Sequence, residues 1–205
     1  MDNGFAVVEA FEKALADYAG CKHAVATSTG TAAIFLSLLA MKMEYGVATV
    51  ICPAKTFISV PMAVRQAGHQ VRLVSDGWTG VYRLHPFELW DGALRFRRGM
   101  YLGGLHCLSF HARKRLAIGE GGAVLTDNEE QAEWIRAARY SGRRAPDYRI
   151  EDVTTIGYQA YMTPEKAARG LHLLSYLPDE LPDLVMEYPD LRESPVFKCV
   201  AHHPV

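Results

Sequence analysis

The sequence lacks three features that would each point to a particular class of protein. No apolar run approaches the length of a membrane-spanning helix, and the N-terminus has no apolar signal-peptide core, so we expect a cytoplasmic protein that does not bind membranes. Charges of one sign form no long run and the formal net charge is -1, which argues against a nucleic-acid partner. The basic cluster Arg95, Arg97 and Arg98 could still meet an anionic small molecule.

Metal-binding and disulfide patterns are also scarce. The four cysteines are scattered without CxxC spacing: Cys21, Cys52, Cys107 and Cys199. We interpret them as thiols of a reducing compartment. The ending KCVAHHPV brings Cys199 near His202 and His203, but a metal site needs more fixed ligands than a chain end normally provides. We therefore expect no metal site.

What is present is an ordinary globular composition. Of 205 residues, 49% are hydrophobic and 22% are charged, which suffices for one domain with a substantial core. Apolar strands predicted at 23–28, 48–53 and 70–75 alternate with helices. This alternation favours an α/β fold, a three-layer sandwich with a mostly parallel sheet and helices on both faces.

The second half of the chain is less regular. Strands are predicted at 105–110 and 122–127, with a shorter one near 87–90. Helices should begin after Asn128 and after Thr163, which are both good N-cap residues. We divide the chain into a compact domain, 1–177, and an extended C-terminal tail, 178–205, which is rich in proline and charge.

Three short segments carry side chains suited to chemistry, and the first is STGTAA, residues 28–33. It lies between a predicted strand and a predicted helix. Gly30 allows close backbone approach, and the N–H groups of the next turn, with the Thr31 hydroxyl, could bind a phosphate group. An ordinary strand-to-helix turn would have the same sequence pattern, so this segment alone does not distinguish a phosphate-binding turn from an ordinary one.

The second segment is ELWDGA, in which Asp91 follows an apolar strand. Ligands of open α/β sheets bind beyond the carboxyl ends of strands, although an aspartate there can also simply cap the next turn.

The third segment is SFHARKRLAIGEGGAV, residues 109–124, which contains Lys114. A lone lysine is usually a solvated charge. Burial beside Arg113 and Arg115 would instead lower the pKa of Lys114 and make its amine a nucleophile. His111 is interpreted as a packing or hydrogen-bonding residue, and GEGG as a tight turn rather than a phosphate loop.

Together the three segments fit one cofactor, pyridoxal 5′-phosphate. The turn at Gly30 would hold the phosphate, Asp91 would keep the pyridine nitrogen protonated, and Lys114 would form the Schiff base.

The chain resembles the DegT/DnrJ/EryC1/StrS family of pyridoxal-phosphate-dependent sugar aminotransferases, which have the aspartate aminotransferase fold. The resemblance runs from about Phe11 to about Leu174. It is carried by FEKALADYAGCKHAVATSTGTAAI, PAKTFISVPMAVRQAG, CLSFHARKRLAIGEGGAVLTD and GYQAYMTPEKAARGLHLL. It implies the large domain of that fold, with the small C-terminal domain largely missing, because the chain is roughly half the usual family length.

The resemblance implies a phosphate-binding role for four residues and a ring-stacking role for a fifth. Gly30, Thr31 and Ala32 match the phosphate-binding turn of the family, and Ser109 matches its phosphate-binding serine. Phe57 matches the aromatic residue that stacks on the cofactor ring.

The resemblance also implies the two catalytic residues. Asp91 matches the aspartate that pairs with the pyridine nitrogen, and Lys114 matches the Schiff-base lysine. Two positions depart from the family. Leu94 replaces a Gln or His that reaches the phenolic oxygen of the cofactor, and Gln159 replaces an Asn that contributes to the neighbouring subunit's site.

The implied function is amino transfer from glutamate to a keto sugar nucleotide by a homodimer. No motif identifies the acceptor. A second hypothesis remains open, in which the chain is a non-catalytic or cofactor-binding scaffold derived from the aminotransferase fold, because Leu94, Gln159 and the short C-terminal region depart from the family.

Overall fold

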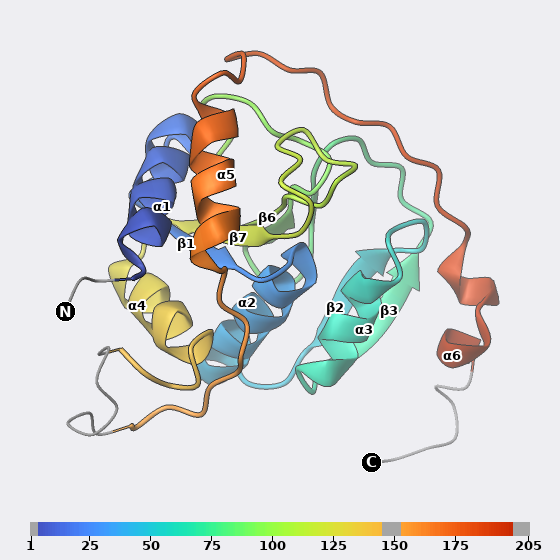
Figure 1. The fold of residues 1–205 in the computed structure, drawn as a ribbon. Coiled ribbons are helices and arrows are strands. Elements are labelled where there is room, and N and C mark those ends of the chain that lie inside the picture. The colour runs from blue at the N-terminus through green and yellow to red at the C-terminus, as the bar shows by residue number, and fades with distance from the viewer. Residues whose placement is uncertain (1–3, 145–152, 199–205) are drawn as a thin grey trace.

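The computed structural model describes residues 4–144 and 153–198 (Figure 1). Its first half alternates helices and strands: α1 (Ala6–Ala19), β1 (His23–Thr27), α2 (Gly30–Tyr45), β2 (Thr49–Pro53), α3 (Ser59–Gln66) and β3 (Gln70–Val74). The second half contains β4 (Tyr82–Arg83), β5 (Leu89–Asp91), β6 (Leu105–Ser109), β7 (Gly122–Thr126), α4 (Glu129–Ala138), α5 (Pro164–Leu174), the 3-10 helix η1 (Leu191–Glu193) and α6 (Pro195–Lys198). The sequence C-terminal to Lys198, including Cys199, His202 and His203, lies outside the described residues.

Several helix ends follow the local chemistry that the sequence predicts. Gly20 ends α1 in the left-handed conformation, with φ of 81°. Asn128 caps α4, because its side chain accepts a hydrogen bond from the Gln131 N–H at 3.1 Å. Pro164 opens α5 as expected, but the Thr163 side chain makes no capping hydrogen bond to the backbone.

The main sheet has five strands in the order β1-β7-β6-β5-β4. Among the strand pairs of this sheet in the described residues, β5–β6 is parallel, whereas β1–β7, β6–β7 and β4–β5 are antiparallel. The strands β2 and β3 form a separate parallel pair, which is linked to the region of β4 by the Ile51 N–H donating to the His85 carbonyl at 2.7 Å.

The expectation of a mostly parallel sheet is therefore wrong. Residues 110–121 join β6 to β7 without a helix, and a parallel neighbour would need a longer crossover. The continuous apolar strands suggested a parallel sheet because they are buried on both faces. Here helices cover both faces of strands that run in opposite directions.

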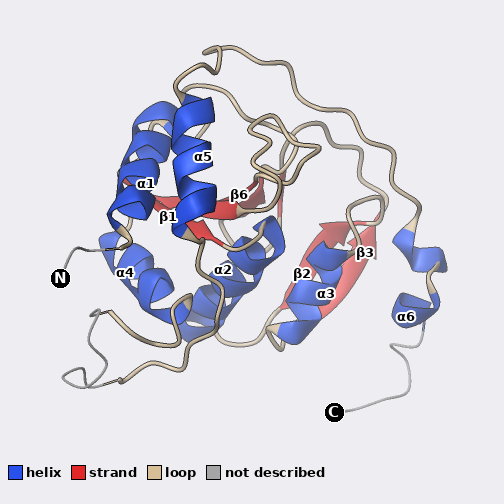
Figure 2. Ribbon diagram, in the orientation of Figure 1, coloured by secondary structure: helices blue, strands red, loops and turns tan. Residues whose placement is uncertain are grey.

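The three-layer architecture is confirmed. On β1, Val25 faces one core with α2 and α4, whereas Ala24 and Ala26 face a second core with α1 and α5. The same alternation divides Val124 and Leu125 of β7. Figure 2 shows α1 and α5 on one side of the strands and α2 on the other.

The tail that follows α5 crosses the molecule (Figure 1). Residues 178–190 contain no helix or strand, and the chain then forms η1 and α6 beside α3 and β3. Leu191 is buried, and its N–H donates to the Ala54 carbonyl at 2.9 Å. The described part of the tail is thus attached to the domain at both ends.

Two further findings concern the described ranges alone. None of their helices is long and apolar enough to cross a membrane. They also contain no cluster of three or more His, Cys, Asp or Glu side chains that could hold a metal ion.

Three cysteines, Cys21, Cys52 and Cys107, are free thiols, and burial raises the pKa of Cys52 to about 12.

Candidate functional site

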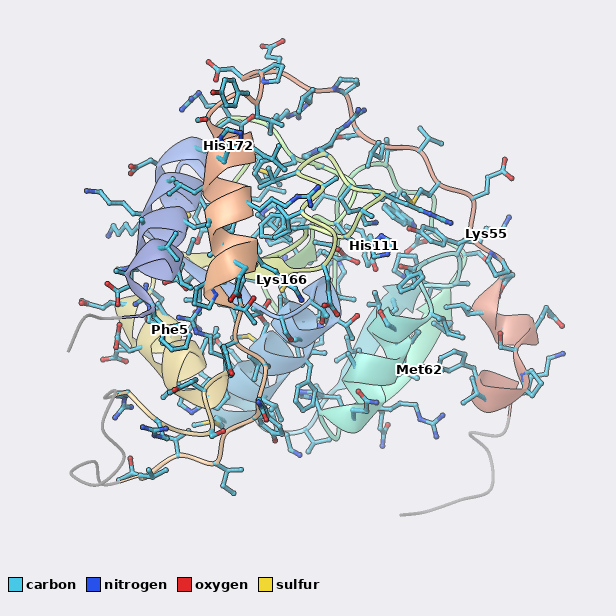
Figure 3. All side chains as sticks on the ribbon, viewed as in Figure 1. Phe5, Lys55, Met62, His111, Lys166 and His172 are labelled. Atoms are coloured by element: carbon cyan, nitrogen blue, oxygen red, sulfur yellow. The ribbon has the colours of Figure 1, made fainter. Side chains whose placement is uncertain are left out.

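A cavity of about 530 Å³ lies where β2, β5 and β6 end and α2 begins. This volume is in the range of small-molecule sites. The sequence-predicted residues that line it are Gly30, Thr31, Phe57, Asp91, Ser109 and Lys114. Figure 3 labels His111 and Lys55, which mark the loops after β6 and β2 on either side of this region. A second hollow of about 750 Å³, at the opposite ends of the strands, contains none of the predicted residues.

The phosphate-binding turn forms at the N-terminus of α2. Thr29 caps the helix: its hydroxyl accepts from the Ala32 N–H at 2.9 Å, and its carbonyl accepts from the Ala33 N–H at 3.1 Å. The Ala32 N–H is therefore already hydrogen-bonded within the helix cap. Ala32 also does not line the cavity, although it was predicted to bind the phosphate. In the described ranges, no hydrogen bond uses the N–H groups of Gly30 or Thr31.

Glycine is required at position 30 because α2 starts against β6. A Cβ at Gly30 would lie 2.7 Å from Ser109 Cβ and 3.2 Å from the Leu108 carbonyl oxygen. A Cβ at Gly122 of β7 would lie 2.5 Å from the Gly30 nitrogen. The two glycines bring the start of α2 beside the Ser109 hydroxyl, where helix N–H groups and a hydroxyl can bind one anion.

Ser59 adds a hydroxyl that sequence reasoning missed. Its Oγ lies 2.8 Å from Thr31 Oγ1, at the start of α3. Only the fold brings these two residues together, since no local motif joins them. Thr31 thereby presents a fixed hydroxyl to the cavity.

Lys114 is partly buried at the cavity wall. Burial lowers the pKa of its ammonium, and the negative charge of Asp91 acts in the opposite direction. The predicted direction of the pKa shift and its predicted cause, burial, are thus supported, whereas Arg113 and Arg115 are not among the causes. Arg115 instead donates to the Pro182 carbonyl in the tail, at 2.6 Å and 3.0 Å.

Asp91 is buried at the end of β5. Its Oδ2 accepts from the Tyr82 hydroxyl at 2.7 Å, and its Oδ1 accepts from the Ala93 N–H at 2.9 Å. The pKa of the Asp91 carboxyl is raised, because the effect of burial exceeds that of the two hydrogen bonds and of the Lys114 charge, which lower it. Asp91 both caps the following turn and lines the cavity, so the two interpretations of this residue are compatible.

Three aromatic residues line the same cavity as Asp91. Phe57 is 55% exposed, and its ring lies edge-on to Tyr188 with centroids 6.3 Å apart. Tyr188 in turn stacks on Trp78, also at 6.3 Å. Trp78 and Tyr188 were not predicted, because the first lies in an irregular segment and the second in the tail.

The tail supplies the last wall of the cavity. Met186 Sδ lies 3.9 Å from Lys114 Nζ, and Glu187 also lines the cavity. Leu184 donates its N–H to the carbonyl of Leu94, whose apolar side chain lines the cavity. Nothing in the sequence of the tail indicated this position.

The basic cluster is used by the tail. Arg95 forms two hydrogen bonds with Asp183, at 2.6 Å and 2.9 Å, and Arg98 pairs with Asp179 at 2.6 Å. Two of the three arginines that were predicted to meet an anionic ligand are therefore engaged with carboxylates of the chain itself.

Two other residues singled out in the sequence, Gln159 and His111, do not lie in the centre of the cavity. Gln159 is exposed, pairs with Tyr140 across an isolated bridge, and does not line the cavity. His111 is exposed at the cavity rim, and its Nδ1 accepts from the Arg113 N–H at 3.3 Å.

Comparison with known proteins gives consistent matches. A model of the DegT/DnrJ/EryC1/StrS aminotransferase family matches residues 2–76 and 97–182. The spore coat polysaccharide biosynthesis protein SpsC of Bacillus subtilis is 30% identical, over 84% of this chain and 57% of that protein. GDP-perosamine synthase of Caulobacter vibrioides is 28% identical, over 83% of this chain and 57% of that protein.

Solved structures show the same fold. A DegT DnrJ EryC1 StrS aminotransferase from Brucella abortus superposes with a TM-score of 0.72 at 22% identity, over 85% of this chain and 60% of that one. NtdA from Bacillus subtilis, solved with bound cofactor PMP, gives a TM-score of 0.70 at 26% identity, over 83% and 48%.

Two features of the matches bear on the site. The chain spans 57% of the length of each of the two curated relatives named above. The family model skips residues 77–96, so it includes Gly30, Ser109 and Lys114 but leaves out Asp91. The position of Asp91 in the cavity is therefore an observation of the structure alone. With the family model matching most of its length, this chain belongs to the DegT/DnrJ/EryC1/StrS aminotransferase family.

Proposed function

We propose that this protein binds pyridoxal 5′-phosphate in the 530 Å³ cavity and transfers an amino group from glutamate to a keto sugar nucleotide. The observation that carries the proposal is the position of Lys114 and Asp91 in the wall of one cavity, together with the N-terminus of α2. Each of these groups suits one part of that cofactor. The N-terminus of α2 suits the phosphate, the Asp91 carboxylate suits the pyridine nitrogen, and the desolvated amine of Lys114 suits the carbon that forms the Schiff base.

The residues present fit the cofactor. The free N–H groups of Gly30 and Thr31, with the hydroxyls of Thr31 and Ser109, would hold the phosphate. The absence of a Cβ at Gly30 keeps this corner open, since that atom would fall 3.1 Å from Ser109 Oγ. Phe57 would contact the ring.

The bound cofactor supplies an electron sink for the carbon that gains or loses a proton. Asp91 would hold a proton at the pyridine nitrogen, which requires that its carboxyl be ionised. Lys114 would hold the cofactor through Nζ and, when released, carry a proton to and from the substrate carbon. Burial favours the neutral amine of Lys114, which is the form that can accept a proton.

The names of the two curated relatives support a sugar as the acceptor class, because one is a polysaccharide biosynthesis protein and the other is GDP-perosamine synthase. The resemblance implies that position 159 contributes to a neighbouring subunit's site, and the exposed position of Gln159 fits that role in a homodimer. We place the protein in the cytoplasm, where keto sugar nucleotides and glutamate would be available to it.

Reconstitution tests the cofactor assignment. Purified protein mixed with pyridoxal phosphate should become yellow, and borohydride should fix the cofactor on Lys114, as peptide mass analysis would show. The Lys114→Ala protein should neither turn yellow nor become labelled. The Lys166→Ala protein, which lacks a lysine of α5 instead, is the control and should behave as the wild type does. Equal labelling of the Lys114→Ala protein would refute the proposal.

Addition of glutamate then separates an enzyme from a cofactor-binding protein. The yellow colour should bleach as the cofactor accepts the amino group and 2-oxoglutarate should be released in equal amount. If the bound cofactor accepts an amino group from none of the amino donors tested, the scaffold hypothesis replaces the transferase hypothesis. Sizing by light scattering should give a dimer, and a clean monomer would refute the homodimer.

A further inference from the structure

Asp91 and Tyr82 come from the same short hairpin, in the segment that the family model skips. Residues 77–96 lie between the two matched ranges and contain β4 and β5. These strands pair antiparallel, with Tyr82 directly opposite Asp91. The hairpin therefore carries its own hydrogen-bond donor for the carboxylate.

A chain of three hydrogen-bonding groups ends at Asp91. The Tyr82 hydroxyl donates to Asp91 Oδ2 at 2.7 Å and lies 2.6 Å from Thr56 Oγ1. Tyrosine has one hydroxyl proton, so Thr56 must be the donor to Tyr82. Thr56 is 1% exposed, and Tyr82 and Asp91 are each 6% exposed, so water does not readily replace any of these bonds.

The ring of Tyr82 is held separately from its hydroxyl. It packs against Trp78 with centroids 4.5 Å apart and belongs to the core that contains Leu84 and Leu89. Replacing Tyr82 with Phe keeps this packing and removes only the hydroxyl. The role of the hydroxyl can thus be measured apart from that of the ring.

We propose that Tyr82 is the positioning residue of Asp91: its hydroxyl, held by Thr56, fixes Oδ2, favours the ionised form of the carboxyl group and orients it at the cavity wall. The inference rests on the proposed function, in which an ionised Asp91 faces the pyridine nitrogen. Burial alone favours the neutral carboxylic acid, which could not hold a proton on that nitrogen. Two hydrogen bonds to the oxygens and the charge of Lys114 oppose burial, and Tyr82 supplies one of these bonds.

The test is a pH titration of the Asp91 carboxyl in the full chain, by ¹³C NMR with Asp91→Asn to assign the signal. A hydrogen bond to a charged group is strong enough that Tyr82→Phe should raise the titration midpoint by about one to two pH units. Thr56→Val should raise it by less, because Tyr82 then keeps its own bond to Asp91, and Thr56→Ser should restore the wild-type midpoint.

Tyr18→Phe is the matched control. Tyr18 is 4% exposed and its hydroxyl donates to the Pro178 carbonyl at 2.7 Å, so this variant also removes a tyrosine hydroxyl from a buried residue. Its Asp91 midpoint should equal that of the wild type. With pyridoxal phosphate labelled with ¹⁵N, Tyr82→Phe should also lower the pH at which the pyridine nitrogen loses its proton.

An Asp91 midpoint that does not move in Tyr82→Phe overturns the inference, whether or not the cofactor binds. If Tyr82→Phe does not fold, an unmoved midpoint in Thr56→Val overturns it in the same way. Failure of the wild-type protein to take up pyridoxal phosphate instead refutes the proposed function. The titration is read without cofactor, so the two failures are distinguishable.

Discussion

The two sides of the cavity are built by different means. On the side of α2, backbone groups are placed by close packing of glycines, and the family model covers this region. On the side of β5, a buried carboxylate is held by side-chain hydrogen bonds from a segment that the family model skips. The same cavity therefore depends on close packing at one wall and on satisfied hydrogen bonds at the other.

The largest expected effect is at the carboxylate wall. Asp91→Asn keeps the shape of the side chain but removes the charge that would hold a proton on the pyridine nitrogen. We expect amino transfer to fall by about 10³-fold, a loss comparable to removing one group that stabilises charge in a transition state. Single-turnover bleaching by glutamate measures it. A rate within threefold of wild type would contradict the assignment of Asp91.

The next largest expected effect is on stability at low pH, and it arises in β6, the strand next to β5. His106 of β6 is fully buried, neither ring nitrogen has a partner in the described part of the chain, and burial lowers its pKa to about 4. Between its ordinary pKa near 6.5 and about 4, the unfolded chain binds more protons than the folded one, so stability falls as the pH falls.

The loss over that range should be about 3 kcal/mol, measured by urea unfolding at several pH values. His106→Leu should flatten this part of the pH profile. The exposed His172 on α5 offers a control, since His172→Leu should leave the profile as it is in the wild type. An equal slope in His106→Leu would show that other groups cause the acid sensitivity.

The steric wall is tested by Gly30→Ala. The new Cβ would meet Ser109 Cβ at 2.7 Å, so the start of α2 must move away from β6. Overpacking of this kind should cost about 2 kcal/mol in unfolding free energy and should weaken cofactor binding. Gly77→Ala is the control, because a Cβ there meets nothing within 4 Å. Unchanged cofactor affinity in Gly30→Ala would argue against a phosphate at this turn.

The smallest effect concerns the tail. Arg95 and Asp183 are 18% and 13% exposed, whereas Arg98 and Asp179 are 54% and 63% exposed. Arg95→Ala should loosen residues 178–190 by about 1 kcal/mol, seen as roughly fivefold faster hydrogen exchange there. Arg98→Ala should produce no measurable change. Equal effects would show that partial burial does not strengthen the first pair.

Much of the fold could be predicted from the sequence because its signals are local. The apolar periodicity and the caps at Gly20 and Asn128 depend on residues a few positions apart. The direction of the strands was not predicted correctly, because burial on both faces does not reveal which way a neighbour runs. The turn at Gly30 and the lysine were identified by their motifs, and both line the cavity.

The rest of the site depends on contacts between distant residues. The Arg95–Asp183 pair joins positions 88 apart, and the Thr56–Tyr82 bond joins positions 26 apart. No periodicity marks Tyr82, Trp78 or the tail, so only their packed positions show that they belong to the site. Burial was correctly expected to lower the pKa of Lys114, but the neighbouring arginines, which were expected to act with it, are not among the causes of the shift.

The contact of Gly122 with the start of α2 has a thermodynamic consequence. A Cβ at Gly122 would lie 2.5 Å from the Gly30 nitrogen and from the Thr29 carbonyl oxygen, so β7 and this peptide are in direct backbone contact. Such contact leaves the turn little conformational freedom to lose when an anion arrives. Binding a phosphate there should therefore carry only a small entropic penalty from ordering the protein, which is the advantage of a site formed before its ligand.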